Sequence, residues 1–111
     1  VLHVADPSAI DLQDVGPAIE RLVPGGINVH FAAPTGRGTL RATHWERGSG
    51  ITRACGSGAV AVAHAAHQWG VVDTEVDVEM PGGRARVLLG SPVVLEGDAT
   101  YVATVEVDAA P

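Results

Sequence analysis

Between residues 46 and 59 the chain reads Glu46-Arg47-Gly48-Ser49-Gly50-Ile51-Thr52-Arg53-Ala54-Cys55-Gly56-Ser57-Gly58-Ala59. This stretch holds the single cysteine and leads into an apolar run that is long enough for a helix over residues 57–69. A glycine-rich turn that feeds a helix gathers free backbone N–H groups and the positive end of the helix dipole at one point. A carboxylate or a thiolate is stabilised at such a point. We therefore interpret Cys55 as a reactive thiolate that shares its helix N-terminus with a carboxylate of the substrate.

Strands and a second helix are expected on either side of this stretch. The close spacing of strands by turn residues after residue 74 indicates antiparallel pairing. The helix over residues 57–69 is apolar on nearly all sides, which is typical of a buried helix. The sequence therefore predicts one α+β domain, residues 1–111, in which a curved, mostly antiparallel sheet wraps around one buried central helix. The expected strands span residues 1–4, 27–33, 39–46, 75–80, 84–89, 93–96 and 100–107, and the other helix spans residues 11–23 with Asp14 as its N-cap.

Two polar side chains interrupt the apolar pattern of the strand at residues 27–33. Ile27, Val29 and Phe31 alternate with Asn28 and His30, so that the two polar residues share one face. Taken by itself, a side chain such as that of Asn28 is more often solvated than functional.

Composition and charge narrow the class of protein. With 46% apolar residues, a chain of 111 residues is expected to fold as one domain with a modest core. The formal net charge of −6 argues against a nucleic-acid-binding surface or a face for anionic membranes. One cysteine allows no internal disulfide and fits a reducing compartment, so we expect a cytoplasmic protein. Val1 lies inside an expected strand, and we expect an excised domain or a mature fragment.

Each candidate residue also has a plainer interpretation. A lone cysteine is often a small core side chain, and Cys55 would then be structural. The glycine-rich stretch lacks the spacing of a P-loop and is a weak dinucleotide signal. His64 and His67 are three residues apart and could hold a metal ion, but hydrogen-bonded histidines in the core or at the helix end are favoured. Glu46 and Arg47 could form an ordinary surface ion pair.

Residues 46–59 closely resemble the second cysteine motif of diaminopimelate epimerases. The similarity includes the cysteine, the glycines around it, the glutamate–arginine pair and the intervals between them. The segment Asn28-Val29-His30-Phe31 resembles the strand of that family that carries a substrate-binding asparagine, and residues 90–100 look like its C-terminal strands. Where the family usually has Gly-Thr after the cysteine, this chain has Gly56-Ser57, which keeps both N–H groups and a hydroxyl.

The resemblance implies a two-domain epimerase with pseudo-twofold symmetry, of which this chain is the C-terminal half. Each half of such an enzyme is a barrel-like sheet around a central helix and supplies one cysteine, and no pyridoxal phosphate, metal or other cofactor takes part. The N-terminal half, and a Gly-Asn-Pro-His segment expected just before Val1, lie outside this sequence. The implied reaction interconverts LL- and meso-diaminopimelate, in lysine and peptidoglycan precursor biosynthesis, by proton transfer between two cysteines and the α-carbon.

The same resemblance assigns roles at the reacting centre. Cys55 is implied to be the catalytic thiol of this half. Glu46 is implied to contact the reacting amino group and to help to set the protonation of Cys55. The N–H groups of Gly56 and Ser57 are implied to hold the reacting carboxylate.

The resemblance assigns the distal, non-reacting end of the substrate to Asn28 and Arg47. A planar guanidinium suits a carboxylate well. The implied partners are diaminopimelate, the N-terminal half of the same enzyme and a second copy in a homodimer, without nucleic acid or membrane. Two alternatives stay open. One is a cysteine-based racemase of the proline racemase type, and the other is a non-catalytic domain that binds a small acid and in which Cys55 is structural.

Overall fold

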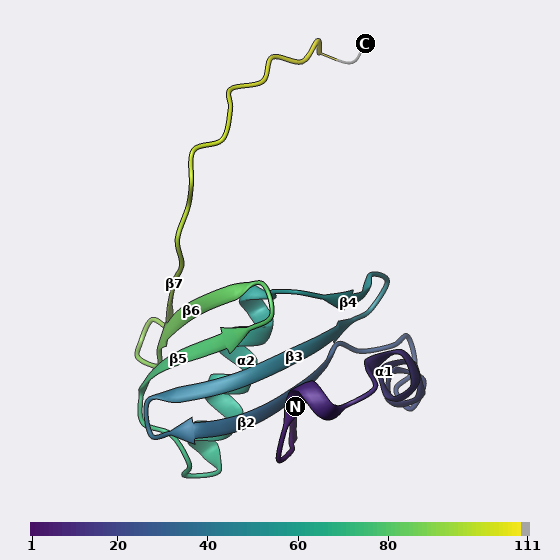
Figure 1. Cartoon of the computed structure of the whole chain (residues 1–111), viewed down its shortest axis with the longest axis vertical. Coiled ribbons are helices and arrows are strands. Elements are labelled where there is room, and N and C mark those ends of the chain that lie inside the picture. Colours follow the sequence, from purple (N-terminus) through teal and green to yellow (C-terminus); the bar gives the residue numbers. More distant parts are fainter. Residues whose placement is uncertain (110–111) are drawn as a thin grey trace.

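Residues 1–109 of the computed structural model form a mixed sheet of seven strands, two α-helices and a short 3-10 helix (Figure 1). The sequence predicts β3 and β5 with the observed bounds, whereas it predicts only a turn where β4 forms. The strands are β1 (Leu2–His3), β2 (Val29–Gly36), β3 (Thr39–Glu46), β4 (Gly50–Thr52), β5 (Glu75–Met80), β6 (Gly83–Leu88) and β7 (Val94–Glu96). The helices are η1 (Pro7–Ala9), α1 (Leu12–Glu20) and α2 (Gly56–Gln68).

The sheet is mostly antiparallel and open. Its hydrogen-bonded order is β1-β2-β3-β5-β6-β7, and β4 pairs with β3 beside this path. Within residues 1–109, four pairings are antiparallel and two, β1 with β2 and β3 with β5, are parallel. The predicted α+β fold with a curved, mostly antiparallel sheet is confirmed, and in the described part of the chain the sheet does not close into a barrel.

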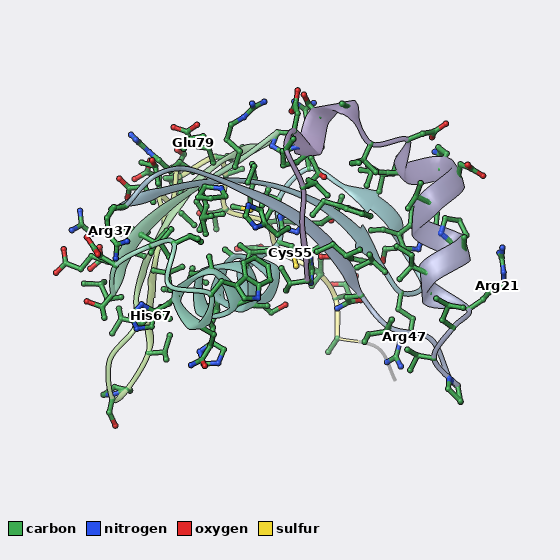
Figure 2. The ribbon with its side chains drawn as sticks, turned by 90° about the horizontal axis from the view of Figure 1, so that it is seen from below. Arg21, Arg37, Arg47, Cys55, His67 and Glu79 are labelled. Carbon is green, nitrogen blue, oxygen red and sulfur yellow. The ribbon has the colours of Figure 1, made fainter. Side chains whose placement is uncertain are left out.

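Helix α2 lies in the hollow of the curved sheet, as Figure 2 shows. Its small apolar side chains pack on β2 and β3 through Ala32, Leu40 and Ala42, and on valines of β5 and β6. The opposite side of α2, which carries the exposed His64, is open to solvent in residues 1–109. The expectation of a helix buried on all sides is therefore wrong for the described residues. The buried residues of α2 are Gly58, Ala59, Val62, Ala63 and Ala66.

Helix α1 and η1 cover the opposite face of β2 and β3. The hydroxyl of Thr43 donates to the carbonyl oxygen of Pro7 at 3.4 Å, and the indole N–H of Trp45 donates to Glu20 at 2.6 Å. Gly16 of α1 is buried directly against the Trp45 ring. Strand β2 is thus enclosed between α2 on one side and the α1–η1 layer on the other.

The N-terminus of α1 differs from the sequence prediction. Asp11, and not Asp14, is the N-cap, because the Asp11 carboxylate accepts a hydrogen bond from the N–H of Gln13 at 3.1 Å. Both aspartates suit a cap, and the helix starts at the earlier one, so that Pro17 lies inside the helix rather than in its first turn. The helix ends at Glu20 rather than at residue 23. Neither α-helix in the described residues combines the length and the apolar character needed to cross a membrane.

The chain after β7 runs away from the sheet (Figure 1). The strand predicted at residues 100–107 is absent from the described structure, where residues 97–109 have no regular secondary structure. Tyr101 and Val102 are 81% and 88% exposed. Alternating side chains favour a strand, but its backbone needs a neighbouring strand for pairing, and this segment has none within residues 1–109. The frayed end expected at residues 109–111 lies mostly outside the described residues.

The contact between Gly16 and Trp45 gives a stability prediction. A Cβ at Gly16 would lie 2.5 Å from two atoms of the Trp45 ring system, far inside contact distance. Gly16→Ala should therefore lower the free energy of unfolding by about 1–3 kcal/mol, although alanine is the better helix former. Denaturant unfolding checks this, with Gly97→Ala, where a Cβ meets nothing within 4 Å, as the control. Unchanged or higher stability of Gly16→Ala would contradict the packing described.

Candidate active site

Cys55 is the N-cap of α2. Its backbone is extended, with φ −149° and ψ 112°, and its sulfur accepts a hydrogen bond from the N–H of Gly58 at 3.2 Å. The Ser57 hydroxyl lies 3.5 Å from the same sulfur. The predicted helix start at residue 57 is thus one residue late, since the helix begins at Gly56. A sulfur in the capping position lies where the helix dipole and the N–H groups of the first turn favour the thiolate.

The N–H groups of the first turn have no acceptor inside a helix. The first backbone hydrogen bond of α2 runs from the N–H of Ala59 to the carbonyl oxygen of Cys55 at 2.8 Å. The N–H of Gly58 donates to the sulfur. This leaves the N–H groups of Gly56 and Ser57, two exposed residues, at the open end of the helix. These two groups can therefore bind an anion beside Cys55.

An open pocket of about 500 Å³ adjoins Cys55. Besides Cys55 and Gly56, it is lined by the β5–β6 turn with Arg84 and by the chain around Glu96. The turn is tied to the cysteine stretch, because the N–H of Gly82 donates to the carbonyl oxygen of Arg53 at 2.6 Å. From the sequence, Pro81-Gly82-Gly83 reads as an ordinary turn, so its place beside Cys55 has no local signal.

The glycine-rich stretch forms a hairpin of β3 with β4. Glu46 is opposite Gly50 and Trp45 is opposite Ile51 in this pairing. Gly48 and Gly50 have φ values of +83° and +80°, in the left-handed region that glycine adopts without strain. The hairpin fixes the path by which the chain leaves β3 and returns to Cys55.

Asn28 and Arg47 are brought together. The side-chain oxygen of Asn28 accepts a hydrogen bond from the backbone N–H of Arg47 at 2.8 Å, and the Arg47 guanidinium donates to the carbonyl oxygen of Gly25 at 3.3 Å. Figure 2 shows Arg47 and Cys55 on the concave side of the sheet, with Arg47 toward the α1 end. Asn28 is thus bonded to the protein and not simply solvated.

A pair of buried histidines lies beneath the start of α2. His30 and His44 are directly opposite each other on β2 and β3, and their Nδ1 atoms are 2.7 Å apart. They are 6% and 0% exposed. Burial lowers the pKa of His30, and burial together with the neighbouring His30 lowers the pKa of His44 to about 4, while the charge of Glu46 raises both. The prediction that His30 lies on a polar face is wrong, since that face is the one covered by α2.

The histidines of α2 have separate surroundings. The Nδ1 atom of His67 lies 3.1 Å from the carbonyl oxygen of Val72, just past the helix end, which confirms the expected helix-end hydrogen bond. His64 is exposed. Within residues 1–109, no group of three or more metal-ligating side chains is arranged to hold a metal ion.

Comparison with known families decides the relationship. The sequence profile of the diaminopimelate epimerase family matches residues 1–102 of this chain. The chain belongs to the diaminopimelate epimerase family. The resemblance stated for residues 46–59 is confirmed.

Individual diaminopimelate epimerases agree with this membership. Those of Rhizorhabdus wittichii and Sphingopyxis alaskensis are 43% and 42% identical to the chain in alignments that cover 97% of it. The epimerase of Bacteroides thetaiotaomicron is 44% identical in an alignment that covers 78% of this chain and 33% of the relative. The chain spans 41% and 42% of the length of the first two relatives.

A solved structure has a similar fold. The Bacillus anthracis phenazine biosynthesis protein of the PhzF family superposes with a TM-score of 0.56, covering 78% of this chain and 28% of its own. Its sequence is 17% identical, so the likeness concerns the fold alone.

The burial of His44 predicts that the folded chain loses stability in acid. An unfolded histidine has a pKa near 6.5, whereas the pKa of His44 in the fold is about 4. Between these values the unfolded chain binds a proton that the folded chain does not, so stability falls as the pH drops from 6.5 to about 4. The decrease in the free energy of unfolding should reach about 3 kcal/mol, with no such loss above pH 6.5. Denaturant unfolding at several pH values measures it.

Two variants test the assignment to His44. His44→Leu removes the titrating group and should flatten the slope between pH 6.5 and 4, whereas His64→Gln, at an exposed site, should keep it. An unaltered slope in His44→Leu would refute the assignment.

Proposed function

We propose that this chain supplies one half of the active site of a diaminopimelate epimerase, with Cys55 as one of two acid–base thiols. The observation that carries the proposal is the hydrogen bond from the Gly58 N–H to the Cys55 sulfur at the start of α2. It supports a thiol whose anion is stabilised and which adjoins free N–H groups and an open pocket.

The proposed reaction inverts one α-carbon of diaminopimelate. A thiolate on one face removes the α-proton, so that an S–H bond forms while the C–H electron pair stays on the α-carbon as a carbanion. A thiol on the other face then donates its proton to that pair and becomes the thiolate. Cys55 is the base in one direction and the acid in the other, and no cofactor takes part.

The carbanion must be stabilised, because an α-proton is far less acidic than a thiol. We assign this role to the N–H groups of Gly56 and Ser57, which would hold the reacting carboxylate at the N-terminus of α2. Preorganised donors of this kind stabilise charge that develops in the transition state. Glu46, which is half-buried at the end of β3, is proposed to contact the reacting amino group and to influence the protonation of Cys55.

The distal end of the substrate is assigned to Asn28 and Arg47. Asn28 holds the backbone of Arg47, so the two residues form one structural unit. The Arg47 guanidinium would exchange its contact with the Gly25 carbonyl for the distal carboxylate, to which it can donate two parallel hydrogen bonds. This fixes the stereocentre that does not react.

The second thiol is proposed to come from another part of the same enzyme. Inversion needs acid–base groups on both faces of the α-carbon, and this chain has a single cysteine. We propose that residues 1–111 are the single-domain C-terminal half of a pseudo-symmetric epimerase. The further proposals are a homodimer and a cytoplasmic role in lysine and peptidoglycan precursor biosynthesis.

Restoring the remainder of the enzyme tests this proposal. In a chimera, residues 1–111 replace the matching segment of the Rhizorhabdus wittichii epimerase, to which they are 43% identical. The chimera should convert LL- to meso-diaminopimelate, whereas the chain alone should not. Cys55→Ser in the chimera should lower kcat by about 10²–10⁴-fold, because a hydroxyl is a far poorer base at this site.

Binding and folding measurements accompany that assay. The Cys55→Ser chimera should keep its circular dichroism and still bind diaminopimelate in a titration, because the main-chain N–H groups remain. Near-normal turnover by the Cys55→Ser chimera would refute the catalytic role of Cys55. Loss of folding would indicate that Cys55 is a structural residue.

Arg47 gives an independent test in the same chimera. Arg47→Lys keeps the charge but loses the planar fork, so kcat/KM should fall by about 10- to 100-fold. Arg21→Lys is the matched control, because Arg21 is exposed at the far end of α1. Equal effects at the two positions would remove the role proposed for Arg47.

A further inference from the structure

The buried histidine pair is in contact with the turn that holds Cys55. A Cβ placed on Gly58 would lie 2.7 Å from Cε1 and 2.9 Å from Nδ1 of His30, and 3.0 Å from the Cys55 sulfur. The imidazole of His30 and the sulfur therefore both border the small space at Gly58 where a side chain would begin. The N–H of that glycine is the donor to the sulfur.

The hydrogen bond between the histidines defines their tautomers. One Nδ1 must carry a proton and donate a hydrogen bond, and the other must be unprotonated and accept this bond, because the two atoms are 2.7 Å apart. The Nε2 atom of His44 is fully buried and has no hydrogen-bond partner. An unpaired buried acceptor is tolerated more readily than an unpaired buried N–H. His44 therefore donates from Nδ1 to His30 Nδ1, and the proton of His30 is on Nε2.

This bond holds the His30 ring in one orientation. The ring centroids are 4.9 Å apart and the rings are nearly perpendicular, at 74°. His44 is itself fixed, since its side chain is completely buried. The His30 ring is thus a rigid support under the first turn of α2.

We propose that His30 is a positioning residue for Cys55: the His44 hydrogen bond holds its imidazole beneath Gly58, and this keeps the Gly58 N–H directed at the sulfur. The inference rests on the proposed function, since it concerns the thiol assigned to proton transfer. Neither histidine is required to touch substrate.

The positioning role requires both histidines to be neutral, because the hydrogen bond between them needs an unprotonated Nδ1 on His30. Burial lowers the pKa of both rings, so both are neutral at pH 7 and above. The charge of Glu46 at the end of β3 acts on the pair from a neighbouring position and raises the pKa of both rings, but burial has the larger effect. Between pH 7 and pH 10, changes in thiol reactivity therefore do not come from titration of the histidines.

The rate at which Cys55 is alkylated in the chain itself tests this positioning role. Because Cys55 is the single cysteine, iodoacetamide reports on one thiol. The rate at pH 7 divided by the plateau rate at high pH measures stabilisation of the thiolate, independently of access to the sulfur. His44→Leu, which cannot donate, should lower this ratio by about fivefold or more, because the hydrogen bond to the charged sulfur is weakened.

A conservative variant separates positioning from packing. His44→Gln can still donate a hydrogen bond to His30, so its ratio should stay within about twofold of the unmodified chain. Equal ratios in the unmodified chain, His44→Leu and His44→Gln would overturn the proposal. In the chimera, His44→Leu should lower kcat with little change in KM.

A measurement without substitution covers the case in which His44→Leu does not fold. Nitrogen-15 NMR of the unmodified chain should show His44 protonated on Nδ1 and His30 on Nε2. Any other tautomer pair, or protonated rings at pH 7, would overturn the inference. An inactive chimera combined with the expected alkylation ratios would refute the proposed reaction but support the positioning role of His30. An active chimera combined with equal alkylation ratios in all variants would support the proposed reaction but refute the positioning role.

Discussion

The hydrogen bond from the Gly58 N–H to the Cys55 sulfur is the contact on which the site depends. It starts α2 at Gly56, and α2 in turn fills the hollow of the sheet. A capping hydrogen bond stabilises the start of a helix, and here a thiol takes the position that serine, threonine or aspartate usually holds. The same bond that begins the central helix therefore also places the sulfur at the positive end of its dipole. Structure and proposed chemistry share one short segment, which limits the substitutions that either can accept.

Much of this arrangement is predictable because its causes are local. Alternation in residues 39–46 and 75–80 marks β3 and β5, and the glycine-rich turn before an apolar run marks the start of α2. The motif in residues 46–59 also reveals the family, because it combines a cysteine, several glycines and a glutamate followed by an arginine at fixed intervals. The fold class, the helix at the centre and the placement of Cys55 at its N-terminus follow from these signals.

The remaining features depend on which segments meet in space. The strand predicted at residues 100–107 has a good pattern, but pairing requires a neighbour that residues 1–109 do not provide. The outer side of α2 is exposed for the same reason, although its composition suits burial. The place of Pro81-Gly82-Gly83 beside Cys55 comes from a hydrogen bond between Gly82 and Arg53, 29 residues apart in the chain. None of these contacts has a local sequence signal.

The buried histidines show how a contact between distant segments can overturn a prediction made from the sequence of one strand. From the pattern of β2, a polar residue at position 30 belongs on a solvent-facing side, yet α2 covers that side, and the cross-strand neighbour is a second histidine. Two imidazoles in the core are tolerable only if they are neutral and bonded to each other, because an unpaired buried polar group costs free energy. One bond satisfies both Nδ1 atoms and leaves the Nε2 of His44 without a partner. Leucine or valine at these positions would avoid that cost, so packing alone does not explain the pair, and its contact with Gly58 links it to the cysteine.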